Sequence, residues 1–569
     1  MAAPLQKSDI LAALRALTEK TVIRRQDLGS TGGQFSPYGP INQYLLMLGQ
    51  QTKPETASEY LFRALIEDTV GAVTFPQVNI GVGYVDFILP ETGSTPVLLE
   101  LKPLFTRYDA EELRSHKLNP RTHLEQVKKY LCKHEYVILT DLRDAYLYSA
   151  RDTFVEDTFF CELAFAELLE RHAQSRNLYD VLRRAEDEIE KPELDRAFFE
   201  DLEQWIGEFA PVRFLQAERA GELVILLINK LIFAKTLEDY GLIPFRFLQD
   251  RYDSEKTDWE AKGLAAYIRT FLQRIEEWLD EHYDTELFEE RIWEQLDKSP
   301  ENLDRFSRKL DLLLGVARWD QVFHRGIVHY NYRRINEDIF GKSYEMFLAA
   351  NRKDEGIYYT PAPITTPMAN SLVEALFAPL VGEIVALLGP DRHEFAAAEP
   401  LLRQLYQIRV VDMAGGSGGF QIKVLRAIWQ QYRRIADACG WSRQVRQDRQ
   451  ELFDLPPEVL HAADFRQRHL FDDTQRRELI ARVLARHIEV PAGDATLRLI
   501  AVTNLALAAI RLSPDDFIYR KLTGTEPLFP SLKSHPRPAC RPARVSWGRC
   551  PAFANRKQLT RSLTASTLL

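Results

Sequence analysis

The spacing of hydrophobic and polar residues predicts a small α/β unit near the N-terminus. Residues 55–71 have the spacing of an amphipathic helix, and strand-like runs follow at 77–89, 95–104 and 136–150. A second helical segment, at 121–133, separates the last two runs. The order helix, strand, strand, helix, strand is typical of a compact α/β domain.

Further along the chain the pattern becomes helical and then returns to α/β character. Residues 155–350 have helical periodicity with long charged faces, whereas residues 355–520 contain a strand, a glycine-rich turn and a helix. We therefore predict an α/β and all-α multidomain protein. Its predicted parts are an N-terminal helical extension (1–50), an α/β domain (51–155), a helical connector (156–335), a partial α/β domain (336–520) and a tail (521–569).

The predicted tail has neither a helical nor a strand period. It contains no acidic residue after Glu526 and is rich in Pro and Arg. A segment that cannot bury an apolar core is expected to be disordered. The composition of the tail also resembles an out-of-frame translation, so we expect a truncated or frameshifted chain.

Composition narrows the class of protein. With a net charge of −9, 45% hydrophobic and 27% charged residues, the chain resembles an ordinary globular protein and has no general basic character. No two of its five cysteines have C-x-x-C spacing, which argues against a disulfide framework or a zinc site and favours a reducing cytoplasm. We see no signal region and no apolar stretch of the ~20 residues that span a bilayer, so we expect no membrane association.

Residues 410–420, VVDMAGGSGGF, join a predicted strand to a predicted helix and contain four glycines. Glycine allows tight turns and close approach to a ligand, and a helix N-terminus offers free N–H groups to a carboxylate. Asp412, at the end of the strand, can accept hydrogen bonds from a cationic or hydroxylated group. These features suit a nucleoside-like cofactor that carries a carboxylate. A tight turn without a ligand is the alternative.

The loop resembles the cofactor motif D-P-A-C-G-S-G-x-F of N6-adenine and N4-cytosine DNA methyltransferases, although Met413 and Gly415 depart from it. Upstream, GIYYTP at 356–361 resembles the G-x-Y/F-Y/F-T-P motif of type I and type IIG adenine methyltransferases, which closes over S-adenosylmethionine. The resemblance implies a partial Rossmann-like domain that binds this cofactor. The cofactor-binding residues that it implies are Gly356, Tyr358, Tyr359, Thr360, Pro361, Asp412, Ala414, Gly416, Ser417, Gly418, Gly419 and Phe420.

Other parts of such a methyltransferase are not found in the sequence. The motif that acts on the target amine, N/D/S-P-P-Y/F, is missing, since Leu455-Pro456-Pro457-Glu458 lacks its polar and aromatic ends. The acidic residue that binds the cofactor ribose is unassigned, and Glu489 and Asp494 are both candidates. We therefore expect cofactor binding with little or no methyl transfer.

A second group of polar residues lies in the N-terminal α/β unit. Asp86 belongs to one strand-like run, and Glu100 and Lys102 lie two residues apart in the next, so they share one face of the strand. Two carboxylates on neighbouring strands can hold Mg²⁺, and a lysine beside them can orient water and stabilise charge on a phosphate. Both charges interrupt an apolar run, VLLELKPL, which is costly unless they are paired or bind metal. A solvated strand face is the alternative.

This spacing resembles the PD-(D/E)xK nuclease superfamily, although Val85 stands where that pattern has a proline. The resemblance implies that Asp86 and Glu100 ligate the metal and that Lys102 is catalytic. It also implies a carboxylate from the preceding helix, for which Glu59 is the first candidate and Glu67 the second. A glutamine on the following helix, Gln126, completes the implied site.

A nuclease, a helical connector and a methyltransferase in this order resemble the type IIG restriction–modification enzymes. The resemblance implies a Mg²⁺-dependent endonuclease that acts on double-stranded DNA and binds S-adenosylmethionine. It also implies a separate target-recognition domain, which is not found in this sequence. Two alternatives stay open: a methyltransferase subunit of a multi-subunit restriction system, and a non-catalytic relic or DNA-binding scaffold.

Overall fold

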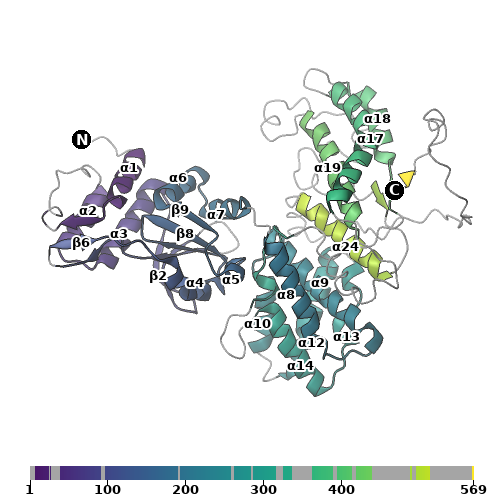
Figure 1. Cartoon of the computed structure of the whole chain (residues 1–569), viewed down its shortest axis with the longest axis horizontal. Helices are drawn as coiled ribbons and strands as arrows, with labels where there is room; N and C mark the ends of the chain where they lie inside the picture. Colours follow the sequence, from purple (N-terminus) through teal and green to yellow (C-terminus); the bar gives the residue numbers. More distant parts are fainter. Residues whose placement is uncertain are drawn as a thin grey trace, which may run out of the picture. The chain divides into compact units, whose positions relative to one another are not determined.

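The computed structural model divides the chain into two compact units (Figure 1). Unit 1 comprises Met1–Phe198, Pro244–Gln249 and Leu310–Arg334. Unit 2 comprises Phe199–Ile243, Asp250–Lys309 and Ile335–Leu569. The residues that the structure describes are 7–24, 26, 28, 39–90, 96–109, 111–189, 193–257, 262–283, 286–315, 325–335, 362–388, 394–412, 418–438, 487–489, 495–512 and 567–568.

Unit 1 is built around a six-stranded mixed sheet with the strand order β2-β3-β4-β7-β8-β9. Neighbouring strands are antiparallel except β4 and β7, which are parallel. A parallel pair requires a crossover connection, which here includes η3 (Pro120–His123) and α4 (Leu124–Leu131). The strands are β2 Phe75–Asn79, β3 Tyr84–Leu89, β4 Val97–Leu101, β7 Tyr136–Thr140, β8 Asp144–Ser149 and β9 Cys161–Ala164.

The sheet buries apolar side chains on both faces. On one face, Val127 of α4 packs in a core with Leu98 of β4. On the other, α3 (Pro54–Leu65) and α6 (Phe165–Ser175) share a core with Leu99 of the same strand. Because β4 and β7 are covered on both sides, every residue of these two strands is buried. This explains why their sequences are nearly continuous apolar runs.

Two of the predicted strand-like runs are hairpins. Run 77–89 divides into β2 and β3 around a tight turn, in which the Ile80 N–H donates to the Gly83 carbonyl at 3.0 Å. Run 136–150 divides into β7 and β8 around Leu142, which has a φ of +71°. An apolar residue at such a turn leaves the hydrophobic pattern uninterrupted, so the pattern predicted too few strands.

The predicted N-terminal extension is not a separate part of the molecule. Helices α1 (Lys7–Thr18) and α2 (Gly39–Gly49) contribute Leu14 and Ile41 to the core beneath α3. Between them, β1 (Val22–Arg24) pairs in a small sheet of order β1-β6-β5. Its partners are β5 Thr106–Arg107 and β6 Glu112–Arg114.

The predicted domain boundary at residue 155 does not coincide with a break in the structure. The strand β9 extends the sheet beyond it, since Tyr146 of β8 pairs with Glu162. Helix α7 (Leu178–Asp187) and α6 then close the core. Residues 310–334, predicted as connector, also belong to unit 1. Long-range packing decides these boundaries, and local periodicity does not report it.

The predicted connector is mainly helical, and most of it lies in unit 2. Helix α9 is mainly apolar and is buried on all sides from Leu223 to Asp239, which is typical of a central core helix. Its Lys230 pairs with Glu276 of α12 at 2.5 Å, so the buried ammonium has a partner. The helices are α8 Glu193–Glu208, α9 Ala220–Asp239, α10 Phe247–Thr257, α12 Leu264–Tyr283, α13 Ile292–Gln295 and α14 Pro300–Leu314.

The C-terminal part of unit 2 combines helices with short parallel strands. Strand β10 (Val410–Val411) lies between β11 (Ile488–Glu489) and β12 (Thr567–Leu568) and is parallel to both. Since β12 belongs to the predicted tail, these two residues contradict a tail without regular structure; an open strand edge accepts any extended segment. The helices are α17 Ala362–Leu388, α18 Phe395–Gln407, α19 Gly419–Ala438 and α24 Ala495–Leu512.

Helix α17 corrects the prediction that no apolar stretch reaches the length of a bilayer. Its residues Pro363–Leu388 are long and apolar enough to do so, by length and composition. Among the described residues, α17 is the one helix that meets these criteria. A stripe that includes Ala369, Phe377 and Ile384 is buried in the core that α17 shares with α18 and α19.

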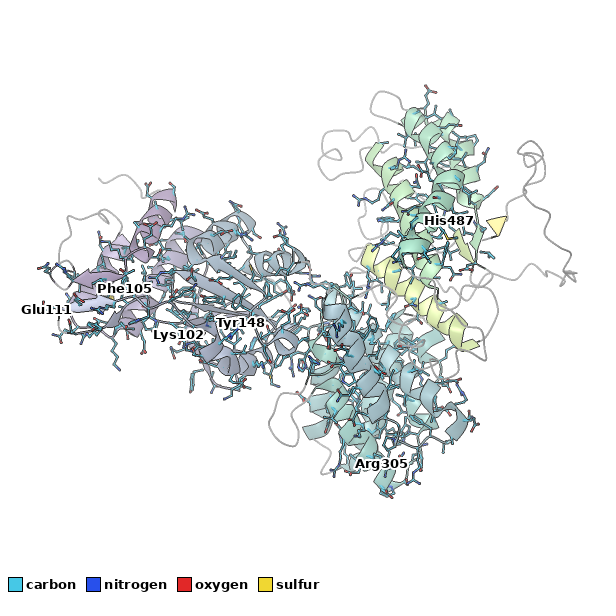
Figure 2. All side chains as sticks on the ribbon, viewed as in Figure 1. Lys102, Phe105, Glu111, Tyr148, Arg305 and His487 are labelled. Carbon is cyan, nitrogen blue, oxygen red and sulfur yellow. The ribbon has the colours of Figure 1, made fainter. Side chains whose placement is uncertain are left out.

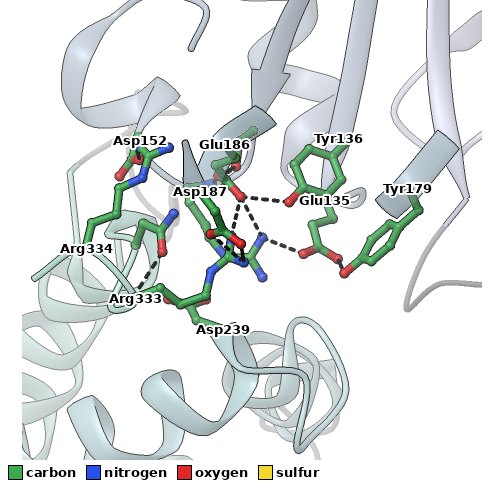
Figure 3. Close-up of polar contacts among 12 residues, drawn as sticks. Glu135, Tyr136, Asp152, Tyr179, Glu186, Asp187, Asp239, Arg333 and Arg334 are labelled. Carbon is green, nitrogen blue, oxygen red and sulfur yellow. Dashed lines mark hydrogen bonds and ion pairs between the residues drawn. The ribbon is translucent and has the colours of Figure 1, made fainter. Parts of the chain in front are cut away.

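Buried ion pairs hold residues 325–334 to the rest of unit 1 (Figure 3). Arg333 donates to Glu186 at 2.6 Å and to Asp187 at 2.9 Å, both on α7. Arg334 donates to Asp152 at 2.9 Å. These ion pairs join residues 325–334 to parts of unit 1 that lie far earlier in the sequence.

Glu186 is at the centre of this network and is fully buried. It also accepts hydrogen bonds from the hydroxyls of Tyr136 (2.7 Å) and Ser149 (2.6 Å). Burial acts to raise the pKa of Glu186, but the charges of Arg333 and Arg151 hold that pKa below its ordinary value. The carboxylate is therefore ionised and depends on its arginine partners.

Replacing Arg333 with methionine should destabilise unit 1, because it removes the closest cation from a buried carboxylate. Removal of one partner from a buried ion pair costs about 3–5 kcal/mol. Amide hydrogen exchange in α7 and β7 should accelerate by about two orders of magnitude, since it reports local stability. Arg184→Met, at an exposed arginine of α7, is the control and should exchange like the wild type. Equal protection in both variants would contradict a stabilising role for the network.

Candidate nuclease and cofactor sites

The sheet brings Asp86 and Glu100 together at the end of the β3–β4 pair. The last paired residues are Phe87 and Leu99, so the two acidic residues come next in their strands. The main-chain N–H of Leu101 donates to Asp86 Oδ2 at 2.8 Å. The carboxylate of Asp86 thus takes part in joining the two strands.

Glu100 is buried, with 4% of its surface exposed, and three side chains surround its carboxylate. Lys102 Nζ and Gln126 Nε2 donate to Glu100 Oε1 at 2.7 Å and 2.8 Å. The hydroxyl of Tyr130 lies 3.2 Å from Oε2. An isolated buried carboxylate would be costly, and these donors offset that cost. Lys102 is labelled on the ribbon of this unit in Figure 2.

Asp86 has fewer stabilising partners than Glu100. Besides the Leu101 N–H, it accepts a hydrogen bond from Gln77 Nε2 at 3.2 Å. Burial raises the pKa of Asp86 above its ordinary value, and the negative charge of Glu100 raises it further. Two like charges in one partly buried site favour either proton uptake or a bound cation.

The structure distinguishes the two candidates for the additional carboxylate. Burial raises the pKa of Glu59 on α3, and the charge of Asp86 is the next cause, so Glu59 lies within electrostatic reach of the site. Glu67 instead accepts a hydrogen bond from Arg63 at 2.7 Å on an exposed helical surface. The charge of Asp86 thus acts on Glu59, whereas Glu67 is paired with Arg63, which favours Glu59 as the candidate.

Tyr130 was not predicted from the sequence. Its hydroxyl accepts a hydrogen bond from Gln126 Nε2 at 2.8 Å, and it lies within hydrogen-bond distance of both Glu100 and the Tyr84 carbonyl. Burial raises the pKa of Tyr130 to about 12, so the hydroxyl remains a proton donor at neutral pH. The i, i+4 spacing of Gln126 and Tyr130 on an amphipathic helix is the signal that could have identified it.

His123 is a second residue that was not predicted. It ends η3, and burial lowers its pKa, with the charge of Lys102 as the next cause. Both causes favour the neutral form of the His123 ring. Its position three residues before Gln126 would place both on one helical face.

The oxygen donors of Asp86 and Glu100 are of the kind that Mg²⁺ prefers. A carboxylate has about four lone-pair positions, so the hydrogen bonds described leave acceptor capacity for a cation. Among the described residues, no group of three or more His, Cys, Asp and Glu side chains is arranged to hold a metal. A metal at this site would therefore have two protein carboxylates and complete its shell with water and phosphate oxygens, which is common for Mg²⁺. The residues fit the ion.

The candidate cofactor residues are described only in part. Asp412 directly follows β10 and is partly buried, and Gly418, Gly419 and Phe420 lie at the start of α19. The remaining candidates lie outside the described residues: Gly356, Tyr358, Tyr359, Thr360, Pro361, Ala414, Gly416 and Ser417.

Gly418 is required by packing as well as by any ligand. Its φ is +87°, a conformation that favours glycine. A Cβ at this position would lie 3.1 Å from the Cα of Ala501 in α24. The close approach of α19 and α24 therefore explains this glycine without a cofactor.

Two acidic residues lie at one edge of the short parallel sheet. Val411 of β10 is opposite Glu489 of β11, and Asp412 follows Val411. The carboxyl ends of parallel strands form the edge at which α/β folds bind ligands. Of the two candidates for the residue that binds the ribose, Glu489 belongs to β11 at this edge, whereas Asp494 lies outside the described residues.

His487 directly precedes β11, and its ring contacts helix α19 and the residues before β10. Figure 2 labels it in this region. Its Nδ1 lies 2.7 Å from the carbonyl oxygen of Ile408, and its Nε2 lies 2.8 Å from the Tyr432 hydroxyl. Burial lowers the pKa of His487 to about 4. The neutral ring therefore donates from Nδ1 and accepts the tyrosine proton at Nε2.

Comparison with known proteins gives one similarity in sequence. The chain is 23% identical over 249 residues to RM.MjaORFECS2P of Methanocaldococcus jannaschii, whose name describes a type II restriction enzyme and methyltransferase. The match covers 38% of this chain, and the chain spans about a fifth (21%) of the relative. No family model matches the chain. Part of the chain is thus similar to a restriction–modification protein.

Two solved structures have a weak structural similarity to the chain. The type IIG restriction endonuclease BpuSI has a TM-score of 0.20 at 10% identity, over 79% of this chain and 49% of the other. A DrdV–DNA complex has a TM-score of 0.19 at 14% identity, over 80% and 44%. TM-scores this low do not establish a common fold.

The buried His487 should make the α19 region sensitive to acid. Unfolded histidine has a pKa of about 6.5, so the stabilisation from the neutral ring is complete above that pH and is lost as the pH falls toward about 4. Hydrogen exchange of α19 amides, corrected for intrinsic rates, should therefore show protection that declines over this range. His487→Gln should lower protection at neutral pH and flatten the decline. His116→Gln, at an exposed histidine, is the control; an identical pH dependence in all three proteins would exclude the role of His487.

Proposed function

We propose that unit 1 is a Mg²⁺-dependent DNA endonuclease and that the chain is a restriction–modification protein that resembles type IIG enzymes. The observation that carries this proposal is the buried carboxylate of Glu100, which Lys102 and Gln126 hold beside Asp86. The partial similarity to a protein named as a restriction enzyme and methyltransferase supports it.

The residues of this site have distinct roles in the proposed hydrolysis. Asp86 and Glu100 would hold Mg²⁺, which lowers the pKa of a bound water and stabilises negative charge on phosphate. Lys102 places its ammonium next to Glu100, where it can orient the attacking water and attract the phosphate. The attacking water would lose a proton to solvent as its oxygen bonds to phosphorus. The bond between phosphorus and the ester oxygen would break, and that oxygen would take up a proton from solvent.

Two residues of α4 position Glu100 for this reaction. Gln126 donates to Oε1 and Tyr130 lies near Oε2, so both oxygens of the carboxylate are restrained. Restraint of this kind lowers the reorganisation that ligand binding requires.

Unit 2 is the basis for a second proposed activity, the binding of S-adenosylmethionine at the turn between β10 and α19. Support comes from the resemblance of residues 412–420 and 356–361 to adenine methyltransferase motifs. The common edge position of Asp412 and Glu489 also supports it. Because the N/D/S-P-P-Y/F motif is not in the sequence, we propose cofactor binding without methyl transfer by these 569 residues. Sequence-specific recognition of double-stranded DNA would come from other residues or another chain.

The two alternatives predict different behaviour. A methyltransferase subunit of a multi-subunit system would bind the cofactor but would not cleave DNA. A non-catalytic scaffold would bind DNA with no cleavage that depends on Asp86 or Lys102. Cleavage and cofactor binding must therefore be measured separately on the full chain.

The full chain should nick supercoiled plasmid with Mg²⁺ and not with EDTA. Asp86→Ala and Lys102→Met should each reduce nicking by about two orders of magnitude or more, because each removes a metal ligand or the cation at the phosphate. Glu111→Gln and Lys53→Met, at exposed residues of the same unit, are the matched controls and should nick normally. Nicking that persists in the Asp86 and Lys102 variants would show that the activity belongs elsewhere.

Asp412→Ala should weaken S-adenosylmethionine binding by about tenfold, the effect of losing a hydrogen bond to a charged group. Isothermal titration calorimetry on the full chain measures this directly. Glu374→Ala, at an exposed acidic residue of α17, serves as the control and should bind normally. Equal affinity in the wild type and the Asp412 variant would rule out this residue as a cofactor ligand.

A further inference from the structure

Gln77 lies opposite the Asp86 carboxylate, on the edge strand β2 of the large sheet. The residues on either side of Gln77 pair with those on either side of Asp86 in β3, so the two are cross-strand neighbours. Continuing the β3–β4 register by one residue places Asp86 opposite Glu100 in the same way. Three adjacent strands therefore contribute an amide and two carboxylates to one row across the sheet.

The side chain of Gln77 contacts Asp86 directly. Its Nε2 donates to Asp86 Oδ1 at 3.2 Å, whereas Oδ2 of the same carboxylate accepts the main-chain N–H of Leu101. The amide thus occupies the Asp86 oxygen that does not take part in joining β3 to β4. Gln77 is exposed, Asp86 is half-buried and Glu100 is buried, so the row is open to solvent at its Gln77 end.

The backbone of Gln77 has an unusual conformation for a strand residue. Its φ is +51°, in the left-handed region that residues with a side chain rarely adopt. Its neighbours in β2 remain paired with β3 on both sides, so the strand continues through this residue. Backbone strain is concentrated at ligand sites, and here it falls on the residue that faces Asp86.

A glutamine amide can interact with Asp86 in two ways. It has a donor, Nε2, and an acceptor, Oε1, and turning the amide over exchanges them. Next to an ionised carboxylate the donor is favoured, which is the contact described above. Next to a cation on that carboxylate the oxygen is favoured, because the N–H dipole would oppose the positive charge. A neutral oxygen also adds a ligand without adding to the repulsion between Asp86 and Glu100.

The distance between the two side chains matches the coordination shell of Mg²⁺. Neighbouring ligand oxygens that each lie about 2.1 Å from an octahedral ion are about 3 Å apart. The Gln77 amide nitrogen is 3.2 Å from Asp86 Oδ1. Exchanging Nε2 for Oε1 would therefore bring an oxygen close to the position of a second ligand with little movement of the backbone.

We propose that Gln77 is a third protein ligand of the metal in the nuclease centre, and that its amide turns from donating to Asp86 to presenting Oε1 when the ion binds. The proposal rests on the nuclease function proposed above and extends its metal site. Gln77 would replace one of the waters that otherwise complete the shell beside Asp86 and Glu100.

The test is direct binding of Mn²⁺ to the full chain, measured from the electron paramagnetic resonance signal of the free ion. Mn²⁺ replaces Mg²⁺ because it accepts the same carboxylate and carbonyl ligands. The binding that Asp86→Ala removes from the wild type defines the site. Gln77→Met keeps the length of the side chain without its amide and should weaken that binding by about tenfold or more. Gln77→Glu should restore it, since it returns an oxygen to the same place.

A matched control and a second measurement separate a ligand from a structural contact. Gln51→Met alters another exposed glutamine of unit 1 with a positive φ, +66°, and should bind Mn²⁺ like the wild type. In plasmid nicking, Gln77→Met should raise the Mg²⁺ concentration for half-maximal rate by about tenfold, the same factor as the loss of affinity. Gln77→Glu should return this concentration to the wild-type value, although a carboxylate cannot replace the amide as a donor to Asp86.

The outcomes distinguish this proposal from the proposed nuclease function. Mn²⁺ binding that Asp86→Ala removes and Gln77→Met leaves unchanged would overturn the role of Gln77 and leave the carboxylate pair as the metal site. Equal weakening in Gln77→Met and Gln77→Glu would also overturn it, because the amide would then act only as a donor. Binding that depends on Gln77 and is restored by Gln77→Glu, without nicking by the wild type, would support the ligand and remove the nuclease assignment. Binding that Asp86→Ala does not change would overturn both proposals.

Discussion

The sheet of unit 1 depends on one constraint, a carboxylate in a strand that is covered on both faces. Glu100 lies in β4, whose five residues are all buried, so its oxygens must find partners within the protein. The donors come from Lys102 and from Gln126 and Tyr130 of α4. The parallel pairing of β4 with β7 requires a crossover, and α4 in that crossover places its polar face over β4. The crossover that the parallel strands require therefore also supplies hydrogen-bond donors to the buried carboxylate of Glu100.

Unit 1 contains two buried carboxylate clusters with different consequences. Glu186 has arginines and hydroxyls around it and keeps a pKa below the ordinary value, so its cluster is complete within the protein. Asp86 has a raised pKa because burial and Glu100 both disfavour its charge. An arginine-paired cluster stabilises the fold, whereas a pair of carboxylates close together gains from a cation supplied by solvent. This contrast supports a structural role for the first cluster and agrees with the role proposed above for the second.

The glycine-rich turn of unit 2 satisfies two requirements at once. Gly418 has a left-handed conformation and allows α19 to approach Ala501 of α24. Its presence in a motif is therefore explained by packing even without a ligand. Asp412 and Glu489 lie at the end of adjacent parallel strands, which is the edge at which α/β folds bind ligands.

Strand periodicity in the sequence placed Asp86, Glu100 and Lys102 on two neighbouring strands, and the resemblance to a nuclease superfamily added Gln126. The structure brings these four side chains together, because spacing along a regular element determines which side chains share a face. The tertiary structure alone added Tyr130, His123 and His487 and assigned residues 325–334 to unit 1. These features arise from contacts between segments distant in sequence. Periodicity describes one element at a time, whereas burial and partner choice depend on how the elements pack together.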